Sequence, residues 1–210
     1  NINSHNSSSL SNFDKSDVPD IFCFNPSPLN NLSSASVTHS VPFRNRKPAA
    51  LRIMNVELWM IGKTDLSYWR EAQDEYVRRL THYLPFSLRI IPDVKNAARL
   101  TESQQKDQEG QQILKALQSS DQCVLLDEKG IEYTSIGFSV YFSKRLQQAS
   151  KRLIFVIGGP YGFSDAVYVR ASDRISVSRM TFSHQMVRVI FLEQLYRSMT
   201  IIRGEPYHHE

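Results

Sequence analysis

Residues 158–162, with the sequence Gly-Gly-Pro-Tyr-Gly, are the first candidate for a ligand-binding segment. They follow the apolar residues 154–157, which predict a buried strand. Gly158, Gly159 and Gly162 have no Cβ, so their backbone can approach a ligand closely. Their spacing matches neither the dinucleotide-binding fingerprint nor the phosphate-binding P-loop. The residue types alone therefore leave two interpretations of equal weight, a ligand-binding loop and a tight structural turn.

Two further segments carry side chains suited to proton transfer or to contact with an anion. His184 and Arg188 lie at the start of the last predicted helix, and Tyr207 and His208 lie in the C-terminal tail. An imidazole exchanges protons near neutral pH, and a guanidinium stabilises developing negative charge. The alternatives are a structural histidine after a helix cap and a solvated pair of Arg188 with Glu193. We expect these segments and the glycine loop to form one site.

Alternating strand and helix patterns define the scaffold that would position these residues. The predicted strands are residues 56–61, 86–91, 122–127, 153–157 and 174–178. The predicted helices are one capped by Asp65 and closed by Pro85, residues 99–118, 135–149 and 164–170, and one capped by Ser183. Such alternation predicts an α/β fold with a mostly parallel sheet and helices on both faces. Ligands bind such sheets beyond the carboxyl ends of the strands, where residues 158–162 lie.

Three details of this scaffold can be checked directly. Residues 128–130 are expected to form a turn after the third strand, and Glu109 and Lys106 to lie on a solvated helix face. The last helix is apolar around more of its circumference than one core contact needs. This excess predicts a second buried face, which a symmetric dimer would supply.

Composition excludes several classes of protein. From Met54 onward there are 20 basic and 18 acidic residues, so nucleic-acid binding would require a local patch rather than a general basic field. Cys23 and Cys123 form neither a disulfide framework nor a metal-spaced cluster, and Cys123 is expected in the core. No apolar run approaches the roughly 18 residues of a membrane span.

Residues 1–53 differ in texture from the rest of the chain. They are rich in Ser and Asn, poor in acidic residues, and without a sustained helical or strand period. Such a segment cannot bury enough apolar surface to offset the entropy of ordering it. Without an apolar h-region it resembles an organelle transit peptide more than a secretory signal. We expect a leader at 1–53 that directs the protein to the chloroplast, with the mitochondrion and a plain disordered extension as the alternatives.

Several separated motifs, in order from Met54 onward, resemble the ribosomal large-subunit pseudouridine N3-methyltransferase family of the SPOUT superfamily. The motifs are MNVELWMIGK at 54–63, LLD at 125–127, FVIGGPYG at 155–162, SRMTFSHQMVR at 178–188, EQLYR at 193–197 and GEPYH at 204–208. The order of these motifs is far more specific than any one of them. The resemblance covers residues 54–210, so the leader lies outside it.

The resemblance implies more than the residue patterns could establish. It implies an α/β sheet sandwiched by helices with a C-terminal trefoil knot, S-adenosylmethionine as cofactor, no metal, and a homodimer with its active site at the subunit interface. The substrate would be large-subunit ribosomal RNA in an assembled ribosome. The implied cofactor contacts are Leu126, Gly158, Gly159, Gly162, Ser178, Arg179, Met180, Thr181, Phe182 and Ser183. The implied candidates for catalysis at N3 of a pseudouridine are His184, Arg188, Tyr207 and His208.

Three alternatives remain open at this stage. The protein could be a SPOUT methyltransferase that acts on another RNA site, or a ribosome-associated RNA-binding module that keeps the fold without the chemistry. A dinucleotide-binding Rossmann enzyme is the third alternative. It needs an acidic residue about 20 positions after the glycines, which Asp173 supplies poorly.

Overall fold

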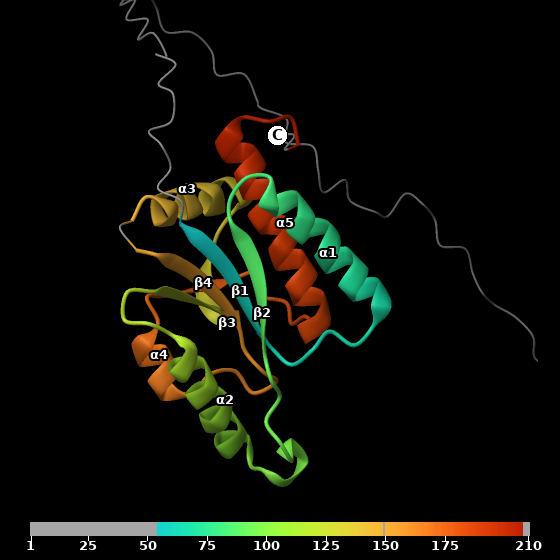
Figure 1. Cartoon of the computed structure of the whole chain (residues 1–210), viewed down its shortest axis with the longest axis vertical. Coiled ribbons are helices and arrows are strands. Elements are labelled where there is room, and N and C mark those ends of the chain that lie inside the picture. The colour runs from blue at the N-terminus through green and yellow to red at the C-terminus, as the bar shows by residue number, and fades with distance from the viewer. Residues whose placement is uncertain (1–53, 149, 208–210) are drawn as a thin grey trace, which may run out of the picture. The chain divides into compact units, whose positions relative to one another are not determined.

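The computed structural model describes residues 54–148 and 150–207, so the leader, Cys23 and His208 lie outside the described residues. The strands are β1 (Asn55–Ile61), β2 (Phe86–Ile91), β3 (Gln122–Glu132), β4 (Arg152–Ile157) and β5 (Asp173–Ser176). The helices are α1 (Ser67–Thr81), η1 (Ala97–Arg99), α2 (Glu102–Ala116), α3 (Ser135–Leu146), α4 (Asp165–Arg170) and α5 (His184–Arg203) (Figure 1). The predicted alternation of strands and helices is confirmed.

The five strands form one parallel sheet in the order β2-β1-β4-β3-β5. Val56 of β1 lies opposite Phe86 of β2 on one side and Leu153 of β4 on the other. β1 and β4, in the middle of the sheet, are buried over almost their whole length, as expected for parallel strands covered on both faces. The predicted α/β class is therefore confirmed. The trefoil knot concerns how the chain is threaded, which strand pairing does not test, and it stays a prediction.

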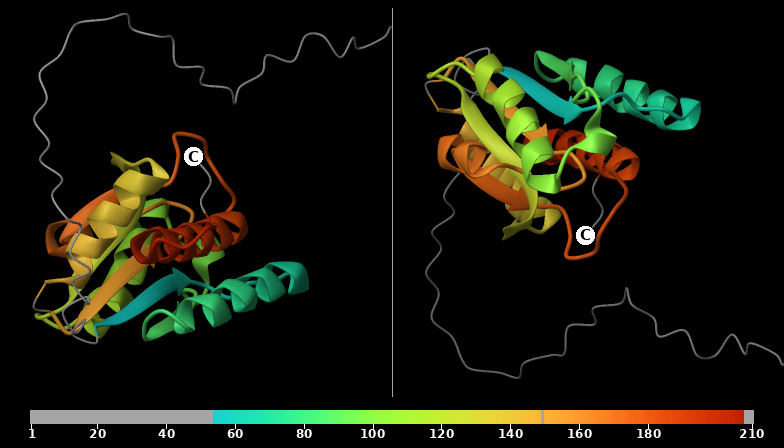
Figure 2. Two further views of the ribbon diagram at one scale, coloured as in Figure 1. Left: turned by 90° about the horizontal axis from the view of Figure 1, so that it is seen from above. Right: turned by 90° about the horizontal axis from the view of Figure 1, so that it is seen from below.

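Alternate residues of the central strands face two separate cores. Leu58, Met60 and Phe155 point into the core beneath α1, α3 and α5, whereas Trp59 and Ile154 point into the core beneath α2 and α4. Figure 2 shows α1 and α5 side by side over one face of the sheet and α2 over the other. Because all five strands run parallel, their carboxyl ends lie at the same edge of the sheet.

Helix α5 lies between α1 and α3 and packs closely against both. Its buried side chains include Phe191, Leu192, Leu195 and Met199, which reach the sheet and the two flanking helices. These contacts within the chain account for the wide apolar surface of the helix. Part of the predicted second buried face is thus supplied within the chain by α1 and α3, and the dimer stays a prediction.

The ends of helices α1 and α2 differ from those expected from the sequence. Helix α1 begins after Leu66, which provides no side-chain cap, so the predicted cap by Asp65 is wrong. The helix ends at Thr81, before Pro85 is reached. Helix α2 begins three residues later than predicted, because Thr101 and Gln104 form a capping box.

Two further expectations are corrected by contacts between elements. The predicted turn at 128–130 belongs to β3, whose pairing with β5 shifts register between Leu126 and Ile131 and then continues to Glu132. Glu109 is 4% exposed rather than solvated, because the α2 face that carries it packs against the segment after β4. Strand β5 ends at Ser176, which leaves Ser178 in the following loop.

Candidate active site

The carboxyl end of β4 and the part of β3 just after its pairing with β4 stops open into a cavity of about 420 Å³, within the usual range for small-molecule sites. Its walls come from residues 126–129 of β3, the glycine loop at 158–162, and the segment between β5 and the first turn of α5. Of the predicted cofactor contacts, those that line it are Leu126, Gly158, Gly159, Gly162, Ser178, Met180, Thr181 and Phe182. Residues up to 56 positions apart in the sequence thus share one concave surface.

The other two predicted cofactor contacts, Arg179 and Ser183, do not line the cavity. Arg179 is exposed, and its Nε donates a 3.0 Å hydrogen bond to Glu132. Ser183 is the N-cap of α5, and its hydroxyl accepts a 3.3 Å hydrogen bond from the backbone N–H of Met186. Ser183 therefore fixes where α5 begins, as the sequence predicted, and so fixes the position of His184.

Two glycines of the glycine loop are constrained, one by its backbone conformation and one by a close side-chain contact. Gly162 has a φ of 80°, in the left-handed region, and its N–H donates a 3.1 Å hydrogen bond to the carbonyl of Gly159. A methyl group added to Gly159 would overlap the carboxylate of Glu109. The loop is therefore a tight turn that also forms a cavity wall, which joins the two interpretations left open by the sequence.

Several lining residues were missed from the sequence, among them Asp127, Phe163 and Tyr168. Asp127 follows the buried part of β3, and its carboxylate accepts hydrogen bonds from the Tyr168 hydroxyl and, at 2.7 Å, from the N–H of Lys129. Burial and this carboxylate raise the pKa of Tyr168 to about 12, so its hydroxyl stays protonated. The signal for Asp127 was its place as the last residue of the predicted strand 122–127.

His184 is the first residue of α5 and lines the cavity. Partial burial, and secondly the positive charge of Arg188, lower the pKa of the imidazole below its usual value of 6.5. The neutral imidazole therefore predominates at neutral pH. A neutral ring can accept a proton from a ligand in the cavity.

Arg188 lies one turn further along α5 but does not line the cavity. It is 2% exposed, and its guanidinium donates hydrogen bonds of 2.9 Å to Oγ1 of Thr64 and 2.5 Å to the carbonyl of Ile61. Its Nε has no hydrogen-bond partner among the described residues. The alternative of a solvated pair with Glu193 is wrong, since Glu193 pairs with Arg197 at 2.5 Å.

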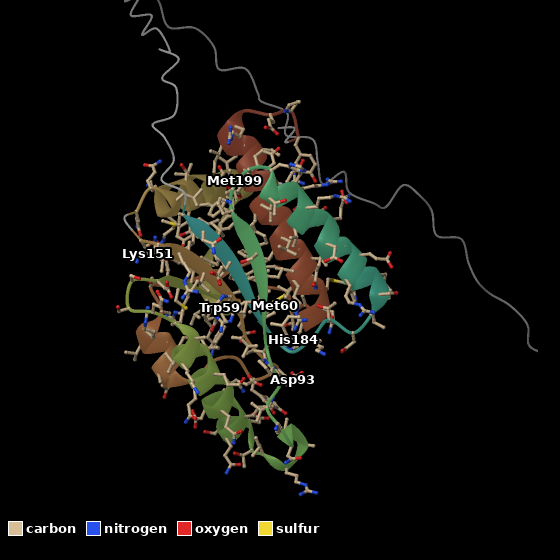
Figure 3. The ribbon with its side chains drawn as sticks, viewed as in Figure 1. Trp59, Met60, Asp93, Lys151, His184 and Met199 are labelled. Atoms are coloured by element: carbon tan, nitrogen blue, oxygen red, sulfur yellow. The ribbon has the colours of Figure 1, made fainter. Side chains whose placement is uncertain are left out.

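Tyr207 packs on the opposite end of α5 from His184. Its ring lies edge-on to Tyr196 with centroids 4.9 Å apart and beneath the guanidinium of Arg197, and its hydroxyl is 3.5 Å from Glu193. Arg197 is about 20 Å along the helix axis from His184, given a rise of about 1.5 Å per residue. Figure 3 shows His184 and Met199 near the two ends of this helix. One chain therefore does not bring Tyr207 to the cavity.

The described residues contain no cluster of three or more His, Cys, Asp or Glu side chains arranged to hold a metal ion. In the same part of the chain, no helix has both the length and the apolar content needed to cross a membrane. Asp173, the acid that a dinucleotide site would need, instead forms a 2.6 Å ion pair with Arg145.

Comparison with known proteins identifies the family. The sequence profile described as "Predicted SPOUT methyltransferase" matches residues 54–208. The protein named ribosomal RNA large subunit methyltransferase H is 60% identical in Parabacteroides distasonis, 54% in Porphyromonas gingivalis and 53% in Flavobacterium johnsoniae. Each alignment spans 157 residues, which is 75% of this chain and 100% of the relative. The chain therefore belongs to the SPOUT methyltransferase family.

Proposed function

We propose that this protein is an S-adenosylmethionine-dependent methyltransferase that methylates N3 of a pseudouridine in large-subunit ribosomal RNA. The observation that carries the proposal is the cavity at the carboxyl edge of the sheet, in which the glycine loop and a neutral His184 share one surface. The names of relatives that align over their full length support the choice of ribosomal RNA.

The residues around the cavity fit the cofactor. Leu126, Met180 and Phe182 offer apolar surface for the faces of an adenine, and the backbone of Gly158 and Gly159 can approach it closely. The Asp127 carboxylate on the same wall can accept hydrogen bonds from ribose hydroxyls. The bound cofactor would supply the methyl group.

His184 is our candidate for the group that prepares the nucleophile. N3 of a pseudouridine lies between two carbonyls and must lose its proton to attack a methyl group. A neutral imidazole at the cavity wall can take that proton. The positive charge of the nearby Arg188 can stabilise the resulting anion of the pseudouridine ring without contacting it. The first turn of α5 would therefore act as the proton-accepting side of the site.

A homodimer would complete this site. Tyr207 lies about 20 Å along α5 from His184, so the tail of a second copy would have to supply Tyr207 and His208. The exposed side chains of Ile136 and Val140 lie one turn apart on α3, and they offer apolar surface for such a contact. The aromatic and imidazole rings of the tail suit the stacking and edge contacts by which unpaired RNA bases are recognised.

Two measurements test the proposed function. Calorimetry should show that the purified protein binds S-adenosylmethionine, and no heat at high concentration would favour the non-catalytic RNA-binding module. Mass spectrometry of nucleosides from a strain that lacks the protein should show loss of 3-methylpseudouridine from the large-subunit RNA. Unchanged 3-methylpseudouridine together with a missing methyl group in transfer RNA would favour the alternative RNA site. Parallel assays on naked RNA and assembled ribosomes would test the assembled ribosome as substrate.

We also propose that residues 1–53 direct the protein to the chloroplast. The support is compositional, since the segment is rich in Ser and Asn and poor in acidic residues. Residues 1–53 fused to a fluorescent protein should accumulate in plastids. Accumulation in mitochondria would select the alternative organelle, and diffuse fluorescence would reject an import signal.

A further inference from the structure

Glu109 is a buried acid that the proposed chemistry does not use. It lies in α2, 4% exposed, and its Oε1 accepts a 2.8 Å hydrogen bond from Nε2 of Gln105. Among residues 54–148 and 150–207, no cationic side chain pairs with it. Burial raises the pKa of this carboxyl, the hydrogen bond from Gln105 opposes that shift, and the charge of Asp93 adds to it. An ionised carboxylate in this place therefore lacks a compensating charge within the described chain.

The position of Glu109 connects it to the cavity. Its Oε2 lies so close to the place that a Cβ on Gly159 would take that a larger residue there would force the carboxylate to move. Gly159 also lines the cavity. The next residue in α2, Gly110, packs with similar closeness against Ser164, which precedes α4. Glu109 thus packs against the glycine loop and Gly110 packs against the segment just after it. The backbone of Gly159 lies between the buried acid and the ligand space.

A buried acid without a cation beside a ligand cavity suggests that the ligand brings the cation. S-adenosylmethionine carries a sulfonium and an ammonium group against one carboxylate, so it has a net positive charge. Coulomb interactions that pass through the protein interior are screened much less than those through water. Glycine keeps the intervening layer as thin as a polypeptide allows.

We propose that Glu109 adds, across Gly159, to the negative charge that balances the net positive charge of the cofactor, together with the acidic residues Asp127 and Glu128 that line the cavity. The residue would thereby make the cavity select a cationic adenosine derivative over a neutral one of similar shape. This inference rests on the proposed function, because it takes S-adenosylmethionine to be the ligand.

The test compares two ligands with four forms of the full chain by calorimetry. The ligands are S-adenosylmethionine and 5′-methylthioadenosine, which keeps the adenosine and the thioether but carries no charge. The proteins are the wild type, Glu109→Gln, Glu109→Asp and the control Glu102→Gln, an exposed acid at the start of the same helix. We expect Glu109→Gln to weaken S-adenosylmethionine binding about tenfold and 5′-methylthioadenosine binding less than about twofold. Glu109→Asp, which keeps the charge, should retain most of the preference.

Three outcomes would overturn the inference. Equal weakening of both ligands by Glu109→Gln would assign Glu109 to packing of the loop alone, and no weakening of either ligand would remove it from binding altogether. If Glu102→Gln also lost the preference for S-adenosylmethionine over 5′-methylthioadenosine, the preference would not depend on a charge beside the glycine loop. Thermal unfolding of each ligand-free variant shows whether it is folded, since the isosteric amide should not lower stability. Failure of the wild type to bind S-adenosylmethionine would instead count against the proposed function itself.

Discussion

Arg188 and Thr64 are 124 positions apart in the sequence, yet the guanidinium of Arg188 donates a 2.9 Å hydrogen bond to the hydroxyl of Thr64. A second hydrogen bond from the same guanidinium reaches the carbonyl of Ile61, the last residue of β1. The two bonds attach the second turn of α5 to the carboxyl end of the sheet. His184, one turn earlier on α5, is held at the cavity by the same attachment.

Replacement of Arg188 by Ala should therefore destabilise the protein and displace His184. We expect the free energy of unfolding to fall by about 3 kcal/mol, because the change leaves a buried carbonyl and hydroxyl without their donor. Chemical denaturation measures this loss. The matched control is Arg203→Ala at the exposed end of α5, which should change stability by less than about 0.5 kcal/mol. Equal effects of the two substitutions would contradict the attachment.

Replacement of Gly159 by Ala should strain the glycine loop against Glu109. We expect a loss of about 1 to 3 kcal/mol in stability, because the added methyl overlaps the buried carboxylate. The double variant Gly159→Ala/Glu109→Ala should recover part of this loss, since the shortened side chain makes room. Denaturation of all four members of this cycle measures the coupling, and strictly additive losses would show that the two residues do not meet.

The pH dependence of methyl transfer should report His184. Its pKa is lowered by burial and by Arg188, so the imidazole stays neutral down to a pH below 6.5. Activity should consequently fall only below that pH, and His184→Gln should lose most activity and no longer show this acid limb in the activity that remains. The free energy of unfolding should change with pH in the same direction as activity. Because the pKa of His184 is lowered in the folded state, the contribution of this residue to stability is present above pH 6.5 and is lost as the pH falls below that value. An acid limb that His184→Gln leaves at full amplitude would exclude the imidazole as proton acceptor.

Complementation between subunits tests the shared site. His184→Ala and Tyr207→Ala should each lose most activity as pure proteins. Mixed, denatured together and refolded, they should regain activity, because a mixed dimer contains one site with an intact His184 and an intact tail. If both residues act within one chain, every chain in the mixture carries a defect and no activity returns. Light scattering on the same samples should show a particle of twice the mass of the chain.

The sequence alone determined the order of the elements and much of the cavity wall. Strand β2 has the predicted limits, Ser183 caps α5, and residues 158–162 follow β4 as expected. These features depend on interactions among near neighbours in the chain, namely apolar periodicity, a serine cap and the missing Cβ of glycine, so the local residue types are sufficient to specify them.

The tertiary structure decided the surroundings of Glu109, Arg188 and Tyr207. Glu109 was assigned to solvent but lies behind Gly159. Arg188 was expected to act in catalysis, with a solvated pair to Glu193 as the alternative, but it reaches Thr64. Tyr207 was placed in the site but packs about 20 Å along α5 from His184. Burial and charge pairing depend on which segments meet after folding, and those partners are 50 to 124 positions away or on another turn of the helix. No local pattern records such contacts, because the same Glu or Arg on a helix face is equally compatible with solvent until another segment covers it.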